Sequence, residues 1–101
     1  MHKRTELQAL LEKILENGNV YFQPPESIKI KFPCIVYEID NIDIKFANDD
    51  KYLKNKKYTL TYIDKNPDNE TVDKILSLKY CSYNRRFISD NLYHDVFTIY
   101  F

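Results

Sequence analysis

Cys34, Cys81 and His94 are the soft metal ligands that lie away from the N-terminus of this sequence. A zinc site usually takes two of its ligands from a C-x-x-C or H-x-x-x-H spacing, because one short turn then presents both to the ion. Neither spacing occurs here. Both cysteines lie in apolar segments, which favours buried, reduced thiols over a disulfide. We therefore expect no metal site.

A catalytic nucleophile is also poorly supported. His94 and Asp95 are neighbours in an expected strand, so they point to opposite faces and Asp95 cannot orient the imidazole. The single glycine, Gly18, excludes the common glycine-rich loops that hold phosphate groups. We expect no enzyme activity and no cofactor. The alternative of a small nuclease would need clustered carboxylates with a metal, or a paired base and nucleophile.

The acidic pairs Asp40/Asp43 and Asp49/Asp50 have the ligand chemistry for a divalent ion. They lack the regular ligand spacing and the central glycine of a calcium loop. We interpret these carboxylates as solvated turn residues.

Two short basic groups are interleaved with aromatic residues. Residues 51–57 carry four lysines and Tyr52, and Arg85-Arg86 lie between Tyr83 and Phe87. Such groups can hold single-stranded nucleic acid by charge and stacking. For the lysine segment we favour a solvated loop, then a protein contact, over nucleic-acid binding. The arginines suit bidentate pairing with carboxylates of a neighbouring molecule.

Composition indicates one soluble domain spanning residues 1–101, with 44% hydrophobic and 30% charged residues. The formal net charge is zero, so no global basic field attracts nucleic acid. Nine tyrosines fit either a half-exposed sheet or an interface. We expect no signal peptide and no membrane span, because no apolar run is long enough.

The first half of the chain shows one helix and several extended segments. Leucines and isoleucines at helical spacing predict a helix over residues 5–16, with Thr5 as its N-cap and Gly18 as a left-handed C-terminal cap. Residues 20–22 and 34–39 are typical of strands. Ile28, Ile30 and Phe32 alternate with lysines, as in a short edge strand.

The sequence predicts a hairpin after residue 39. With Asp40-Asn41 as a two-residue turn, Ile39 would face Ile42 and Tyr37 would face Ile44. Residues 47–57 then form a long loop or hairpin tip.

The second half predicts a strand over residues 58–64, then a helix with Pro67 in its first turn that ends near Leu78. Asn66 or Asp68 is the expected cap, and the apolar stripe is Val72, Ile75 and Leu76. Strands over residues 80–88 and 94–101 flank an Asp90-Asn91 turn. The predicted class is α+β, a mostly antiparallel sheet with two helices packed on one face.

Three stretches, "VYFQPPESIKIKFPCIVYEID", "KKYTLTYIDKNPDNETVDKIL" and "CSYNRRFISDNLYHDVFTIYF", resemble small structural proteins encoded in the head–tail joining region of long-tailed phages and prophages of Gram-positive bacteria. These are the tail-terminator or tail-completion (neck) proteins. The resemblance covers the chain from Val20 onward. It leaves open whether the chain is a terminator, a connector or a stopper.

The resemblance implies a ring, commonly a hexamer, that caps the tail tube and docks on the head connector or stopper protein. It implies a virion protein assembled in the host cytoplasm, whose lumen passes DNA without sequence-specific binding. It implies no enzyme activity, no cofactor and no membrane contact. The alternative function is a small nucleic-acid-binding module that uses residues 51–57 and Arg85-Arg86.

Two segments are candidate contacts between subunits. The proline-rich residues 23–33 are stiff, so they lose little entropy on docking and can brace the sheet edge or reach a neighbour; alternatively they only cross the sheet within one subunit. Residues 49–57 are the second candidate. The predicted contact residues are Pro24, Pro25, Lys29, Lys31, Tyr52, Lys54, Lys56, Lys57, Arg85 and Arg86.

Overall fold

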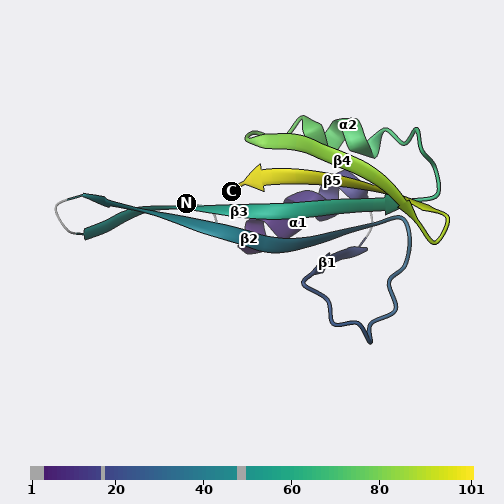
Figure 1. Ribbon diagram of the computed structural model, residues 1–101, viewed down its shortest axis with the longest axis horizontal. Coiled ribbons are helices and arrows are strands. Elements are labelled where there is room, and N and C mark those ends of the chain that lie inside the picture. The colour runs from purple at the N-terminus through teal and green to yellow at the C-terminus, as the bar shows by residue number, and fades with distance from the viewer. Residues whose placement is uncertain (1–3, 17, 48–49) are drawn as a thin grey trace.

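The computed structural model describes residues 4–16, 18–47 and 50–101, with the side chains of residues 41–55 outside the description. In these residues the elements follow in the order α1 (Arg4–Leu15), β1 (Val20–Phe22), β2 (Cys34–Ala47), β3 (Asp50–Asp64), α2 (Thr71–Leu76), β4 (Cys81–Ser89) and β5 (Leu92–Tyr100). The strands form one sheet in the order β1-β2-β3-β5-β4 (Figure 1).

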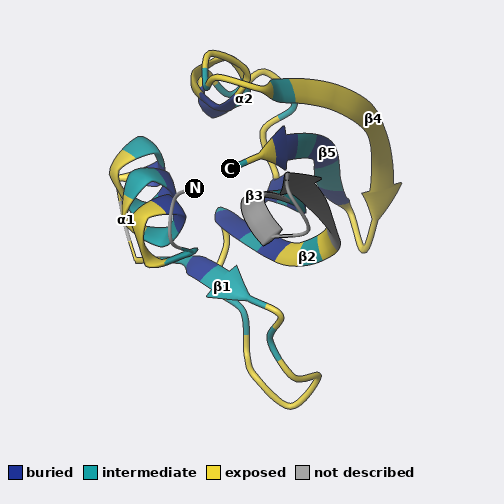
Figure 2. Cartoon of the chain, turned by 90° about the vertical axis from the view of Figure 1, so that its left-hand side faces the viewer, coloured by how far each residue is buried: buried dark blue, intermediate teal, exposed yellow. Residues whose placement is uncertain are grey.

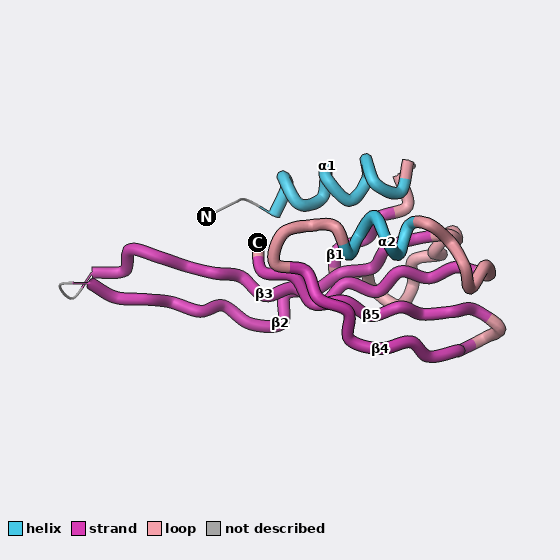
Figure 3. Tube along the Cα trace, turned by 90° about the horizontal axis from the view of Figure 1, so that it is seen from above, coloured by secondary structure: helices cyan, strands magenta, loops and turns pink. Residues whose placement is uncertain are grey.

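The sheet is mixed. β1 runs parallel to β2, whereas the β2–β3, β3–β5 and β4–β5 pairs are antiparallel. Both helices lie on the same face of the sheet, as the view from above shows (Figure 3). The predicted α+β class, with a mostly antiparallel sheet and two helices on one face, is therefore confirmed.

The main core lies between the helices and this face of the sheet (Figure 2). Alternate residues of each strand point into it, because successive side chains of a strand point to opposite faces. Its fully buried members from the sheet are Ile35, Tyr37, Tyr58, Leu60, Tyr62, Phe97 and Ile99. A smaller cluster of Cys34, Ile63 and Leu92 lies on the opposite face, where Ile30 of the β1–β2 connection packs against it.

α1 begins one residue earlier than predicted and presents Leu7, Leu11 and Leu15 to the core at intervals of four residues. Each buried leucine contributes about 2 kcal/mol. The predicted left-handed cap at Gly18 is wrong. Glu16 has a φ of 62° at the end of the helix, and no described glycine has a positive φ. The reversal thus comes directly after the last helical turn, before the glycine.

The predicted turn at Asp40-Asn41 is wrong. β2 continues through it to Ala47, and the ladder with β3 shifts register between Ile39 and Asn41. The physical reason is the longer apolar match with β3, in which Ile35, Tyr37 and Ile39 face Tyr62, Leu60 and Tyr58. A bulge accommodates the turn-forming residues within the strand, and it costs less free energy than losing this register would.

Most of the predicted loop over residues 47–57 is therefore strand. β2 and β3 beyond Asp40 and Lys57 form a two-stranded ribbon, here called the arm (residues 40–47 and 50–57), which extends past the other strands at one end of the molecule (Figure 1). The molecule measures 52 × 29 × 23 Å, and the arm lies along its longest axis. Asp40 lies at the base of the arm and Asp43 within β2, so neither occupies the predicted solvated turn. Asp49 lies outside the described residues.

α2 starts later than predicted. Thr71 is its first residue, and Pro67 lies in the preceding turn. Asn66 and Asp68 do not cap it: the Asn66 side chain accepts a hydrogen bond from the Asp68 backbone, and the Asn69 side chain accepts one from the Thr71 backbone at 2.8 Å. Of the expected stripe, Ile75 is buried, Val72 is half-buried and Leu76 is exposed.

The Asp90-Asn91 turn is confirmed. Both residues have positive φ, 52° and 63°, as a two-residue hairpin turn requires. β5 begins at Leu92, two residues before the predicted start, and β4 covers most of the predicted strand. The predicted edge strand over Ile28, Ile30 and Phe32 is wrong, because these residues form an irregular connection without a strand ladder.

The hydroxyl of Tyr58 is buried and has no hydrogen-bond partner among the described residues. An unpaired buried hydroxyl is destabilising, so we expect Tyr58→Phe to raise the free energy of unfolding by about 1 kcal/mol. Urea unfolding followed by circular dichroism measures this. Tyr37→Phe is the matched control: its hydroxyl donates to Gln8 and accepts from Arg4, so the same change should lower stability by about 1–2 kcal/mol. A loss of stability in Tyr58→Phe would contradict the assignment.

Candidate functional site

The predicted contact residues do not converge on one site. Pro24, Pro25, Lys29 and Lys31 lie on the β1–β2 connection, and Tyr52, Lys54, Lys56 and Lys57 lie on β3 in or beside the arm. Arg85 and Arg86 lie on β4, at the other edge of the sheet. The molecule therefore offers three separate surfaces for contact.

The β1–β2 connection is held to its own sheet at both ends. The Gln23 backbone donates to Tyr37, and the Gln23 side chain accepts from the Ile39 backbone at 3.2 Å. Near the other end, the Lys31 backbone donates to the Tyr21 hydroxyl at 3.3 Å. Between these anchors Ile28 is 45% exposed, and Phe32 beside the second anchor is 44% exposed. The segment thus crosses within its own subunit and still presents apolar side chains outward, so its contact with a neighbour stays a prediction.

The arm carries the lysine-rich segment. Lys57 pairs with Asp40 across the base of the arm at 3.2 Å, with both side chains partly exposed. This ion pair joins the two strands where the ladder resumes after the bulge, and its exposure limits its contribution to stability. The Tyr52 and Lys54 positions lie further out, where the structure describes the backbone alone.

Arg86 does not reach outward to a neighbour, contrary to the sequence-based expectation. Its Nε donates to Asp95 Oδ1 at 2.7 Å and its Nη2 to Asp95 Oδ2 at 3.2 Å. The Tyr83 hydroxyl donates to the same Oδ1 at 2.7 Å, and Arg86 also reaches the Pro67 carbonyl at 2.8 Å. The Asp95 side chain is 3% exposed and that of Arg86 is 35% exposed. The expected bidentate pairing exists, but inside one chain.

A bulge in β4 makes this cluster possible. Residues three apart in a regular strand point to opposite faces. The β4–β5 register shifts between Tyr83 and Arg85, so Tyr83 faces Phe97 while Arg86 faces Asp95. Phe97 and Asp95 share the helix-covered face, and both β4 side chains therefore reach one carboxylate.

The electrostatics of the cluster are those of a structural ion pair. The hydrogen bond to Asp95 raises the pKa of Arg86, and burial, followed by the hydrogen bond to Asp95, raises the pKa of Tyr83. Nearby, burial raises the pKa of Tyr62, and its hydrogen bond to Asp64 adds to that rise. These shifts keep the arginine charged and the tyrosines neutral at physiological pH, which suits fixed hydrogen bonds and not proton transfer.

The outer part of β4 is unusually open. Every residue from Ser82 to Ser89 is exposed, including Ile88 at 65%. On the face away from the helices, Phe87 stacks on His94 with ring centroids 4.6 Å apart, and the Arg85 guanidinium lies 5.3 Å from the Phe87 ring centroid. Just before the strand, Tyr80 is 76% exposed. This strand presents an edge and several apolar side chains to solvent.

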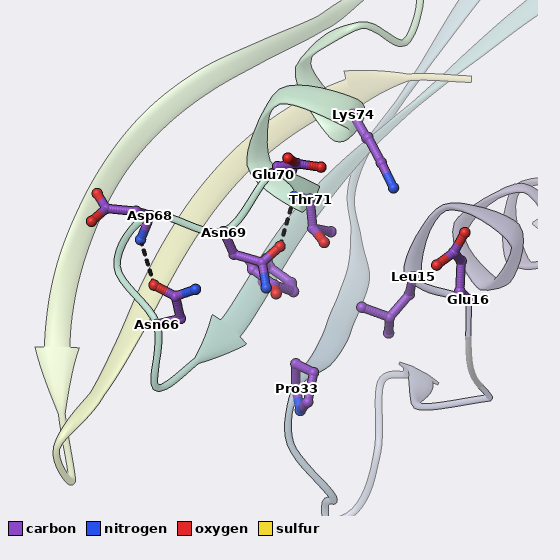
Figure 4. A pocket seen from close by; sticks show the side chains of 10 residues that line it. Leu15, Glu16, Pro33, Asn66, Asp68, Asn69, Glu70, Thr71 and Lys74 are labelled. Atoms are coloured by element: carbon purple, nitrogen blue, oxygen red, sulfur yellow. Dashed lines mark hydrogen bonds between the residues drawn. The ribbon is translucent and has the colours of Figure 1, made fainter.

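A polar cleft of about 470 Å³ lies between the end of α1 and the start of α2 (Figure 4). Leu15 and Glu16 line one side, and Lys74 points toward it from α2. The amide groups of Asn66 and Asn69 are used by the turns before α2. Its polar side chains thus hold the connection into the helix in place.

The thiols support no reactive or metal-binding role. Cys34 and Cys81 are unpaired, and burial raises their pKa values to about 12 and about 11. Among the residues that the structure describes, no group of three metal-ligating side chains comes together. His94 is half-buried, and its Nδ1 lies 3.1 Å from the Leu92 carbonyl.

Asp95 and Tyr83 were missed by the sequence-based selection of contact residues. The sequence does indicate the Arg86–Asp95 pair, because a two-residue turn at Asp90-Asn91 places Arg86 directly opposite Asp95 in the hairpin.

A scan against models of known protein families matches none of them, and a search of curated proteins finds no match. Within the described residues, no helix is long and apolar enough to cross a membrane.

Proposed function

We propose that this chain is a structural protein of the phage head–tail interface, which assembles with copies of itself into a ring that ends the tail tube and joins it to the head connector. The observation that carries this proposal is the sheet with two open edges and a projecting arm. Such edges are liable to pair with another chain unless something covers them. In an assembly subunit such edges can form contacts with a neighbouring subunit, whereas in an isolated globular protein they must be protected from pairing.

The arm supports the same proposal. A two-stranded ribbon is only marginally stable on its own in water and needs a third strand or another surface beside it. Over residues 41–47 of β2 and 50–56 of β3, no third strand accompanies the ribbon within the described residues. A neighbouring subunit in a ring, or the tail-tube protein below it, supplies that surface.

The alternative of nucleic-acid binding has less support. Arg86 is engaged by Asp95, and β5 separates β4 from the lysine-bearing β3. Among the side chains that the structure describes, the two basic groups thus do not form one continuous surface.

Light scattering over a range of protein concentrations tests the proposal, at low and moderate salt, with and without a short DNA duplex. We expect a species several times the mass of one chain, or a monomer–ring equilibrium, that does not depend on DNA. A chain that stays monomeric and associates only with DNA, losing that association in salt, would favour the nucleic-acid module instead.

A further inference from the structure

We propose that a second copy of this chain docks the open edge of its β2 against the outer edge of β4, in antiparallel register, so that one sheet continues from copy to copy. This inference names the contact for the proposed ring and rests on that proposal. It concerns two different edges of the same sheet, and such head-to-tail contacts are the kind that close into rings.

Among the described residues, the two edges lack a neighbouring strand over similar lengths. β4 has nine residues and pairs on one side with β5, with no strand on its other side among the described residues. β1 covers β2 only as far as Tyr37. From Glu38 to Ala47, ten residues of β2 have no strand beside them on that side in the described chain, and the side chain of Gln23 bonds the backbone there at Ile39.

The charges of the two edges are complementary. Residues 38–47 contain three acidic residues and one lysine, which gives a net charge of −2. β4 contains Arg85 and Arg86 and no acidic residue, a net charge of +2. Within one copy Asp95 pairs with Arg86 and Lys57 pairs with Asp40, so the charge left for a neighbouring copy is +1 on β4 and −1 on residues 38–47. Complementary charge steers two edges together and disfavours pairing of like edges, so pairing of β4 with β4 of another copy is opposed.

The direction of pairing follows from the topology. β2, β3, β5 and β4 alternate in direction, so β4 runs antiparallel to β2 within one copy. Continuing the sheet with the same alternation makes the next β2 antiparallel to β4 as well. The open part of β2 lies in the arm, beyond the level of β4 (Figure 1). Adjacent copies are therefore staggered along the strands, as in a closed barrel with tilted strands.

Cross-linking between introduced cysteines tests this contact. Glu38, Ser82 and Ser89 are all exposed and all lie on the face away from the helices. Antiparallel docking brings Ser89 of one copy close to Glu38 of the next, whereas parallel docking brings Ser82 there. We expect the double variant Glu38→Cys/Ser89→Cys, treated with a short bismaleimide, to form a ladder of oligomers. Glu38→Cys/Ser82→Cys should cross-link at least about tenfold more slowly, since docking raises the effective concentration of only one pair.

Controls separate docking from random collision. The double variant Lys13→Cys/Ser89→Cys has its first cysteine at an exposed position of α1, which covers the face of the sheet opposite to Glu38 and Ser89, and should give no ladder. The unmodified chain, with its native Cys34 and Cys81, sets the background. Equal rates for the Ser82 and Ser89 variants, or dimers formed by Ser89→Cys alone, would overturn the proposal.

A charge reversal gives a second readout. Arg85→Glu in the Glu38→Cys/Ser89→Cys background should slow the ladder several-fold, and the effect should weaken in salt. Lys13→Glu makes the same charge change on α1 and should leave the rate unchanged. Light scattering that finds a ring without this cross-link would overturn the edge contact and leave the ring proposal standing. A cross-link without a ring would support the contact and count against self-sufficient ring assembly.

Discussion

Replacing Arg86 by alanine should lower the free energy of unfolding by about 2–3 kcal/mol. The change leaves the Asp95 carboxylate, whose side chain is 3% exposed, without its bidentate partner. Removing one partner of a fully buried pair costs more, about 3–5 kcal/mol, and partial exposure of Arg86 and the remaining bond from Tyr83 reduce that cost. For a domain of this length the loss corresponds to a fall in Tm of roughly 10–20 °C.

Arg85→Ala is the matched control, because it removes the same side chain from the adjacent position of the same strand. Arg85 is exposed and its guanidinium lies over Phe87, so its removal should change stability by no more than about 0.5 kcal/mol. Arg86→Lys keeps the charge but loses the fork of donors, and its stability should fall between wild type and Arg86→Ala. Urea unfolding at low protein concentration separates these effects from self-association. Equal stability of the two alanine variants would show that the Arg86–Asp95 pair contributes nothing.

The Arg86–Asp95 pair also shows how much of the candidate site the sequence predicts. Asp90-Asn91 is a strong hairpin signal, and a two-residue turn fixes the strand register by itself. The pairing of Arg86 with Asp95 follows from that register. The bulge that brings Tyr83 to the same carboxylate does not follow, because no residue at that position requires positive φ or breaks the strand pattern.

Asp40-Asn41 shows where local signals fail. The same kind of turn signal appears there, and the short hairpin it predicts also gathers apolar residues on one face. The structure instead pairs β2 with β3 along nearly its whole length, which pairs more apolar positions. A choice between two registers with similar patterns depends on the whole sheet, and local propensity cannot decide it.

The parallel pairing of β1 could not be read from its three residues. The residue pattern of so short a strand does not indicate whether the strand pairs in parallel or antiparallel with its neighbour. Its direction depends on where the proline-rich connection leads, and that connection returns to the start of β2 after anchoring through Gln23 and Lys31. Parallel neighbouring strands need a connection that runs the length of the strand and back, and the proline-rich segment provides it.

Alkaline pH should destabilise the protein strongly between pH 9 and pH 12. Burial raises the pKa values of Cys34 and Cys81 from 9.0 to about 12 and about 11, and it raises those of Tyr37, Tyr58 and Tyr62 above 10.0. In the folded chain these groups keep their protons at a pH where the unfolded chain releases them. Their contribution to stability is therefore complete below pH 9 and is lost as the pH rises through the folded pKa values.

The slope reports the number of protons involved. Each proton that the unfolded chain releases and the folded chain retains lowers stability by about 1.4 kcal/mol per pH unit. Urea midpoints from pH 7 to pH 11.5 give the slope, and absorbance of tyrosinate gives the ionisation directly. We expect a late phase of absorbance, in which Tyr37, Tyr58 and Tyr62 ionise only together with the loss of circular dichroism.

Tyr58→Phe is the control for this assignment, because it removes one of the buried ionisable groups and fills the same space. The variant should show a shallower loss of stability above pH 10 and a smaller late phase of tyrosinate absorbance. Stability that stays constant from pH 8 to pH 11 would mean that these side chains ionise freely in the folded chain. That result would contradict the burial of Tyr37, Tyr58 and Tyr62 beneath the two helices and of Cys34 on the opposite face of the sheet.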